Sequence, residues 1–215
     1  MVKAFDLLEQ FDNRRTGNIF GVVVAIVIDN YDPEGRGRVK VKFPQIASIE
    51  DGQWARIATL MAGESRGSFF LPEINDEVLV AFERGDITRP FVLGALWNGV
   101  DVPPYDNADK ENNLRFIKSR SGHLIRLDDK EGAEKIEIID KSGNNSVIID
   151  TASNTITITS DADVKIEAPK GTIKLNAQNI EIASSAETKV AAQGGLNLDG
   201  SPGTTTIKGA TVNIN

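Results

Sequence analysis

The sequence predicts an all-β protein, built from a small barrel followed by a repetitive stalk. Three observations lead to this prediction: short apolar stretches bounded by Gly, Pro, Asn and Asp before residue 100, a polar connector at 101–113, and an apolar pattern that returns every eight residues towards the C-terminus. Apolar residues separated by one polar residue form one face of a strand, and small polar residues between such segments favour bends.

The bulk composition narrows the classes of function. The chain has 215 residues, 40% of them hydrophobic, which suits two small soluble domains. A net charge of −7 argues against nucleic acid as the main ligand. The absence of Cys excludes disulfides and thiolate metal sites. Charged residues within 1–17 and a short apolar run at 19–28 predict a cytoplasmic product without a signal peptide or membrane span.

The first segment, residues 1–17, is expected to be a docking helix or arm. Its apolar residues follow a brief helical stripe that suits docking onto a hub protein: Phe5, Leu8 and Phe11. A frayed terminus is the alternative, and in either case the segment lies outside the core.

Residues 18–100 are expected to form the barrel. Strands are predicted at 19–28, 37–43, 53–58, 77–82 and 91–97. Five short strands favour a closed barrel of the OB type. Aromatic residues make up only 6% of the chain and no cations appear interleaved with them, so we interpret the barrel as a scaffold. Four cations alternate along the second predicted strand: Arg36, Arg38, Lys40 and Lys42. We interpret them either as the ordinary polar face of this strand or as a contact for an acidic surface of the hub protein.

The remaining chain is divided into a linker at 101–113, transition strands at 114–135 and a stalk at 136–215. Within the stalk, steps of eight residues from Ile156 repeat a pair of apolar residues separated by one position. An octad buries only two or three apolar side chains, which hardly offsets the entropy cost of ordering it. Three chains that each supply one wall of a triangular tube would close the interior.

The sequence therefore predicts an obligate homotrimer with an intertwined β-helix or β-prism. Its core is expected to contain the repeated apolar pairs, which are Ile156, Ile158, Val164, Ile166, Ile173, Leu175, Ile180, Ile182, Leu196, Leu198, Val212 and Ile214.

Several motifs resemble, in order, the VgrG and gpV-type spike proteins of contractile tails. They are GRVKVKFP at 37–44, WARIA at 54–58, FFLPEINDEVLVAF at 69–82, GDITRPFVLGALWNG at 85–99, SRSGH at 119–123 and LDDKEG at 127–132. Each motif is structural and weak alone, whereas their order and spacing, followed by octads, are specific. The resemblance covers residues 18–215.

This resemblance implies an OB domain in a baseplate, a trimeric β-helical needle and a mechanical role in puncturing a target membrane when a sheath contracts. It also implies a separate hub protein, inner-tube or effector proteins as further partners, and assembly into a phage-like or extracellular contractile particle. The only histidine, His123, is far from the C-terminus, so the iron-binding tip of some short spikes is not expected. A PAAR-type cap is expected instead to contact Val212, Asn213, Ile214 and Asn215.

Enzymatic and cofactor sites are not expected. A triad or a metal ring would have to use His123, whose strand-like surroundings favour a packing or solvent-facing role. The acidic residues Asp128, Asp129, Glu131 and Glu134 lie among lysines and are interpreted as a solvated turn. Two alternatives remain open: a trimeric tail-fibre or adhesin stalk, and a polysaccharide-degrading β-helix enzyme.

Overall fold

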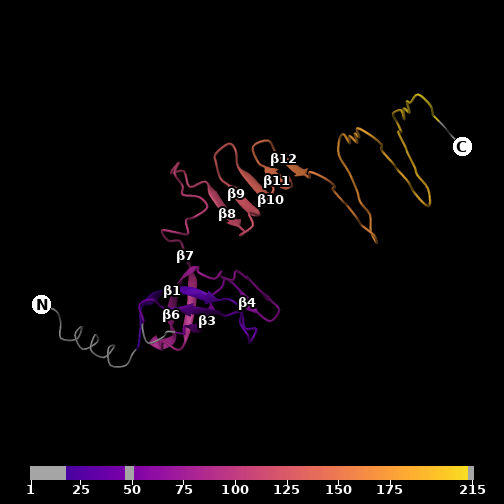
Figure 1. Cartoon of the computed structure of the whole chain (residues 1–215). Helices are drawn as coiled ribbons and strands as arrows, with labels where there is room; N and C mark the ends of the chain where they lie inside the picture. The colour runs from indigo at the N-terminus through magenta and orange to yellow at the C-terminus, as the bar shows by residue number, and fades with distance from the viewer. Residues whose placement is uncertain (1–17, 47–50, 213–215) are drawn as a thin grey trace. The chain divides into compact units, whose positions relative to one another are not determined.

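A computed structural model describes residues 18–46 and 51–212 and divides the chain into two compact units, residues 1–159 and 160–215. The first unit contains a closed five-stranded barrel and a five-stranded antiparallel sheet (Figure 1). The predicted docking residues Phe5, Leu8 and Phe11 lie outside the described residues, as do the last three of the expected cap contacts.

The barrel confirms the all-β prediction for the N-terminal domain. Its order is β1-β2-β3-β7-β6, and its strands are β1 (Val22–Asp29), β2 (Val39–Lys42), β3 (Gln53–Ile57), β6 (Glu77–Phe82) and β7 (Pro90–Leu96). All neighbouring pairs are antiparallel except β3 and β7, which are parallel. The five expected strand positions agree with these bounds to within a few residues.

The barrel core is made by strict alternation along its strands. In β6, Val78, Val80 and Phe82 are buried and alternate with residues that face outwards. Phe82 meets Phe43 with ring centroids 5.3 Å apart. Because the strands close on themselves, a single chain buries this core completely.

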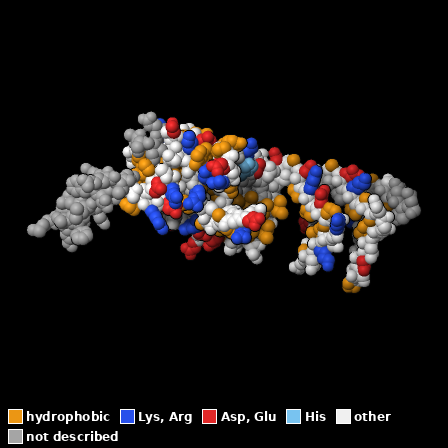
Figure 2. All heavy atoms as spheres, turned by 90° about the horizontal axis from the view of Figure 1, so that it is seen from below, with side chains coloured by type: hydrophobic (Ala, Val, Ile, Leu, Met, Phe, Trp, Pro, Cys, Tyr) orange, Lys and Arg blue, Asp and Glu red, His pale blue; other side chains and the backbone are white. Residues whose placement is uncertain are grey.

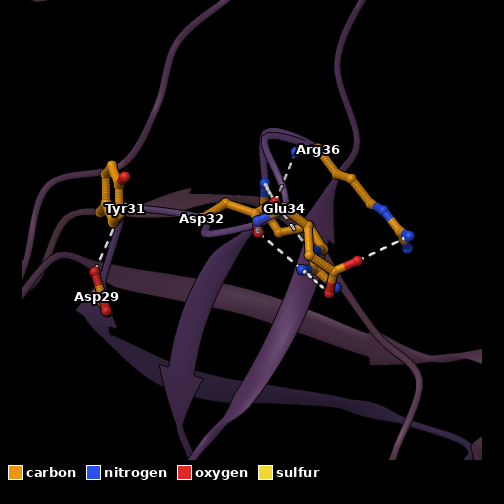
Figure 3. Close-up of polar contacts among 6 residues, drawn as sticks. Asp29, Tyr31, Asp32, Glu34 and Arg36 are labelled. Atoms are coloured by element: carbon orange, nitrogen blue, oxygen red, sulfur yellow. Dashed lines mark hydrogen bonds and ion pairs between the residues drawn. The ribbon is translucent and has the colours of Figure 1, made fainter.

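The loop between β1 and β2 is organised by Asp32 (Figure 3). Its carboxylate accepts hydrogen bonds from the backbone N–H groups of Glu34, Arg36 and Arg38, and Arg38 donates two further bonds from Nε (3.0 Å) and Nη2 (2.8 Å). The Arg38 guanidinium therefore holds the pKa of Asp32 well below its usual range. The same guanidinium donates a hydrogen bond of 2.7 Å to Glu34, so Arg38 stabilises the loop by binding both of these acidic residues.

On the outer surface of the barrel, two arginines contact aromatic rings, although cations and aromatic residues are not interleaved in the sequence of its strands. Arg38 lies over the ring of Trp54 at 5.5 Å, and Arg56 lies over the ring of Phe91 at 4.4 Å. Cations and aromatic rings are thus brought together across neighbouring strands, a pairing that the spacing along any one strand does not reveal.

Two small elements decorate the barrel. Strands β4 (Ala62–Gly63) and β5 (Arg66–Gly67) form a short hairpin, and the 3₁₀ turn η1 (Glu83–Gly85) joins β6 to β7. At the end of η1, Gly85 adopts a φ of 80°, and a Cβ there would lie 3.1 Å from the ring of Phe20. Glycine is therefore required at this turn.

The sheet that follows the barrel is an antiparallel meander in the order β12-β11-β10-β9-β8. Its strands are β8 (Leu114–Lys118), β9 (Leu124–Asp128), β10 (Lys135–Ile139), β11 (Ser146–Asp150) and β12 (Thr155–Thr159). Residues 114–135 and the beginning of the expected stalk thus share one sheet, which also includes Ile156 and Ile158.

In the second unit, the described residues 160–212 contain no strand. The chain runs in extended segments that reverse direction repeatedly (Figure 1). Two of the reversals have the same hydrogen bonds: Ser160 Oγ accepts from the N–H of Ala162 and donates to the carbonyl of Asp163, and Ser184 does the same with Ala186 and Glu187. The β-helical form of this region therefore stays a prediction.

Candidate functional site

One face of the sheet β8–β12 is almost entirely apolar. Alternation in each five-residue strand places Ile, Leu or Val on this face, and the antiparallel register aligns them from strand to strand. We call this set the apolar ladder, and its members are Ile117, Ile125, Leu127, Ile136, Ile138, Val147, Ile149, Ile156 and Ile158.

The ladder has two columns. One runs through the directly paired residues Ile117, Ile125, Ile138, Val147 and Ile158. The other runs through Leu127, Ile136, Ile149 and Ile156, with Arg115 opposite Leu127 at its start. Directly opposed β-branched side chains pack well across strands, so each column is a continuous apolar strip.

A single chain leaves this ladder uncovered. Eight of its nine members are exposed, from 40% for Ile149 to 71% for Ile156, whereas Val80 in the barrel is fully buried. Isolated soluble domains rarely present contiguous apolar patches of this kind, and such patches mark interaction sites. The apolar ladder is therefore a candidate interaction surface.

The same pattern of apolar pairs continues through the second unit. There the pair members are also exposed, and hydrophobic side chains lie on the surface of the extended segments next to the C-terminal end (Figure 2). These exposed residues include most of the expected trimer core, namely Val164, Ile166, Ile173, Leu175, Ile180, Ile182, Leu196, Leu198 and Val212. Ile214 lies outside the described residues.

Sequence reasoning missed the part of the ladder before Ile156. The first members of successive pairs are Ile125, Ile136, Val147, Ile156 and Val164, and they are separated by 11, 11, 9 and 8 residues. A search for a fixed period of eight therefore detects only the last step. The signal that remains constant is the pair itself, two apolar residues separated by one residue, which is polar or charged in every strand of the ladder except β11, where it is Ile148.

The opposite face of the sheet contains two charged pairs that cross neighbouring strands. Arg126 Nε donates to Glu137 across β9 and β10, and the Glu137 side chain is only 8% exposed. This hydrogen bond raises the pKa of Arg126. Beside it, Lys135 Nζ lies 3.5 Å from Asp150 across β10 and β11. This face combines the paired charges with half-buried apolar side chains, Phe116, Leu124, Ile139 and Ile148, whereas the ladder face leaves its apolar side chains exposed.

The turns of the sheet account for the polar residues that might have carried chemistry. His123 is exposed, and its Nδ1 accepts a hydrogen bond of 3.2 Å from the N–H of Lys141. Asp128 accepts from the N–H of Lys130, and Asp129 pairs with Arg115 at 3.1 Å. Within residues 18–46 and 51–212, no group of three or more acidic or histidine side chains is arranged to hold a metal ion.

A cleft of about 410 Å³ lies beside β8. Its lining is aromatic and aliphatic with one amine, and consists of Trp97, Pro104, Tyr105, Leu114, Phe116 and Lys118. Tyr105 is held by Asp109, which accepts its hydroxyl hydrogen bond at 2.8 Å. The lining contains no nucleophile paired with a base.

In the described part of the chain no helix has the length and apolar character needed to cross a bilayer.

Comparisons with known proteins agree with this architecture. Residues 23–97 match the sequence model of the type VI secretion system/phage-baseplate injector OB domain, a stretch that runs from β1 to the end of β7. The match therefore covers the barrel itself.

Three curated relatives extend the similarity beyond the barrel. Type VI secretion system spike protein VgrG1a of Pseudomonas aeruginosa is 31% identical over 129 residues, which are 54% of this chain and 20% of that protein. Spike protein VgrG3 of Vibrio cholerae is 29% identical over 119 residues, 52% of this chain and 11% of that protein. Actin cross-linking toxin VgrG1 of Vibrio cholerae is 28% identical over 131 residues, 54% of this chain and 12% of that protein. The aligned residues thus span a fifth or less of each relative.

Proposed function

Because this chain belongs to the VgrG/gpV-type spike proteins, through its injector OB domain and the sequence that follows it, we propose that three copies assemble into the central spike of a contractile injection baseplate. The role is structural and mechanical rather than enzymatic. The exposed apolar ladder is the observation that carries the proposal, since it is a surface that a single chain cannot cover.

The dimensions of the sheet favour three copies over two or four. A five-residue strand is about 17 Å long, and a triangular prism with walls of that width places each wall about 5 Å from its axis. This is half of the roughly 10 Å that separates packed sheets, so side chains from three walls meet at the axis. A prism of four such walls would leave an unfilled space along its axis, and two packed walls would leave the apolar side chains at their edges exposed to water.

Burial of the ladder offers enough free energy for a permanent assembly. Each Ile, Leu or Val contributes about 1.5–3 kcal/mol when fully buried, so the ladder offers on the order of 10 kcal/mol per chain. The pairs at 160–212 extend the same interface. Obligate assemblies characteristically bury apolar surfaces of this kind.

The mechanical role follows from the direction of the hydrogen bonds. In the proposed prism the strands lie across the axis, so their hydrogen bonds run along it at about 4.8 Å per layer. Five strands and seven further octads would reach on the order of 60 Å. An axial load compresses many of these bonds together, and their simultaneous loss is required for failure, which makes unfolding slow.

We further propose the partners that such a position requires. A hub protein would hold the barrel end, a PAAR-type cap would cover the tip near Val212, and inner-tube or effector proteins would complete the particle. The target membrane would be met only transiently, during puncture.

The proposal is tested by two neighbouring substitutions on β12, Ile158→Asp and Thr157→Asp. Both side chains are exposed in a single chain and alternate between the two sheet faces. A monomeric protein would tolerate the two changes equally. The proposed trimer buries three carboxylates in the Ile158 variant, at a cost of several kcal/mol per trimer, and none in the Thr157 variant.

The expected result is therefore loss of the trimer in sedimentation equilibrium for Ile158→Asp and an intact trimer for Thr157→Asp. The pair Leu196→Asp and Asn197→Asp repeats the test in the second unit. A folded wild-type monomer at micromolar concentration, or equal behaviour of the paired variants, would refute the proposal.

A further inference from the structure

The cleft beside β8 and the open edge of that strand are formed by the same three residues. Leu114, Phe116 and Lys118 line the cleft, and β8 is the end strand of its sheet, where β9 is its neighbour (Figure 1). Alternation places these three side chains on the face opposite the apolar ladder. In the proposed prism the ladder faces the axis, so the cleft stays on the outside.

The backbone groups of the same three residues point to the open edge. The N–H of Ser119 donates to the carbonyl of His123, and the register along β8 has no shift, so every second residue from Ser119 back to Arg115 bonds to β9. The residues between them are the cleft residues, and their N–H and C=O groups are directed away from β9. Such an edge can pair with an added strand.

The two ends of the cleft carry opposite charge. At one end, the hydrogen bond that Asp109 accepts raises the pKa of Tyr105, and the charge of Asp128 adds to this effect. Asp128 is paired with Leu114, so the acidic end lies at the start of β8. At the other end, about 13 Å along the strand, Lys118 is exposed and has no acidic partner among the described residues.

We propose that this cleft is a docking site for an extended acidic peptide segment of a partner protein, which adds a strand to the edge of β8. The segment carries apolar side chains beside Leu114 and Phe116 and a carboxylate beside Lys118, at alternating positions that match those of the strand. Trp97 and Tyr105 supply the aromatic surface that its apolar side chains contact. Backbone hydrogen bonds hold the segment, and its side chains determine which segment is chosen.

Other classes of ligand match these features less well. A nucleic acid strand brings one phosphate per nucleotide, whereas the cleft lining has a single cation and carboxylates act on its other end. A small aromatic acid would use Lys118 and the rings but would leave the strand edge unpaired. A peptide uses both. Every lining residue belongs to one chain, so docking does not depend on the proposed trimer.

Fluorescence anisotropy of a labelled synthetic peptide tests this inference on the full-length chain. The probe alternates threonine with leucine, phenylalanine and glutamate, in that order, and is expected to bind saturably with a dissociation constant in the micromolar range. Lys118→Glu should weaken binding roughly tenfold, and a probe with lysine in place of glutamate should regain affinity for this variant alone. Lys42→Glu, at an exposed lysine on β2, is the matched control and should leave binding unchanged.

Selective N-methylation of the probe tests the pairing with the edge. An added strand directs alternate N–H groups to β8 and the others to water. A probe methylated at the leucine, phenylalanine and glutamate nitrogens and one methylated at the threonine nitrogens should therefore differ in affinity by roughly tenfold.

Three results would overturn the inference: no saturable binding below about 1 mM, equal losses for Lys118→Glu and Lys42→Glu, or equal binding of the two methylated probes. Sedimentation equilibrium of the same protein reports the trimer separately. Failure of this inference is thus distinguishable from failure of the proposed function.

Discussion

The barrel and the sheet β8–β12 are built from the same number of strands and similar types of residue, but only the barrel buries an apolar face completely within one chain. In the barrel, closure turns every inward Val and Ala towards the other strands, and Val78, Val80 and Val92 are buried. In the sheet, the corresponding Ile residues remain uncovered. Alternation therefore specifies a face, while closure determines whether one chain can bury it.

The largest difference should appear when the same kind of side chain is shortened in each region. Val80→Ala should cost about 2 kcal/mol per chain, at any protein concentration, because the cavity lies inside one barrel. Ile138→Ala should cost roughly 6 kcal/mol per trimer, because three copies lose contacts at one interface.

Chemical unfolding at several protein concentrations measures both effects. The midpoint of the sheet transition in the Ile138 variant should fall on dilution, whereas the barrel transition in the Val80 variant should not move. If the Ile138 variant behaves like the wild type at every concentration, the sheet does not depend on other copies.

A smaller effect is expected from the charged face of the sheet. Arg126→Met leaves the buried Glu137 carboxylate without its partner and should destabilise the sheet by roughly 2 kcal/mol. Replacing both residues by Met should restore most of this loss. Arg120→Met, which removes the exposed pair with Glu73 at 2.9 Å, is the matched control and should cost less than about 1 kcal/mol.

The Arg126 set is measured by thermal unfolding at fixed protein concentration. Equal losses for Arg126→Met and Arg120→Met would contradict the distinction between a sheltered and an exposed pair.

The smallest differences should appear in acid, where the carboxylate with the most strongly lowered pKa in each region, Asp140 in the sheet and Asp32 in the barrel, becomes protonated. Hydrogen bonds from Ser142, and then from Asn145, lower the pKa of Asp140 in the sheet to about 2. Arg38 lowers that of Asp32 in the barrel further. Since both folded-state values lie below the unfolded value of about 3.9, their stabilisation is complete above about pH 4 and is lost on acidification.

The contribution of Asp140 should therefore vanish between about pH 4 and 2, and the contribution of Asp32 only at lower pH. Thermal unfolding of Asp140→Asn and Asp32→Asn as a function of pH checks this order. Each variant should lower the unfolding temperature at neutral pH and flatten the acid dependence of its own region alone.

Much of the barrel could be predicted because its signals are local. Punctuation by Gly, Pro and Asp delimits β2, β3 and β6, and alternation identifies their core residues. Contacts between distant segments could not be predicted in this way. The stacking of Arg56 on Phe91 depends on the parallel pairing of β3 with β7, and the sequence of neither strand indicates this pairing.

The candidate interface was predicted only in part, for a physical reason. The apolar pair is constrained by the face it must occupy, whereas the turns between pairs can vary as long as they reverse the chain. Residues 129–134 and 140–145 connect strands of the meander, but only 151–154 connect β11 to β12. A fixed period therefore emerges late in the chain, and Ile125, Ile136 and Val147 escape a search based on it.

The two identical serine turns have a consequence for how such an assembly could come apart. Ser184 follows Ser160 by 24 residues, which is three octads. A chain that moves to the next of three walls at every octad returns to its starting wall after that distance and completes one revolution. Three chains that coil around one another in this way are topologically interlocked. A force perpendicular to the axis could not separate them, and the chains could dissociate only by unwinding from a free end.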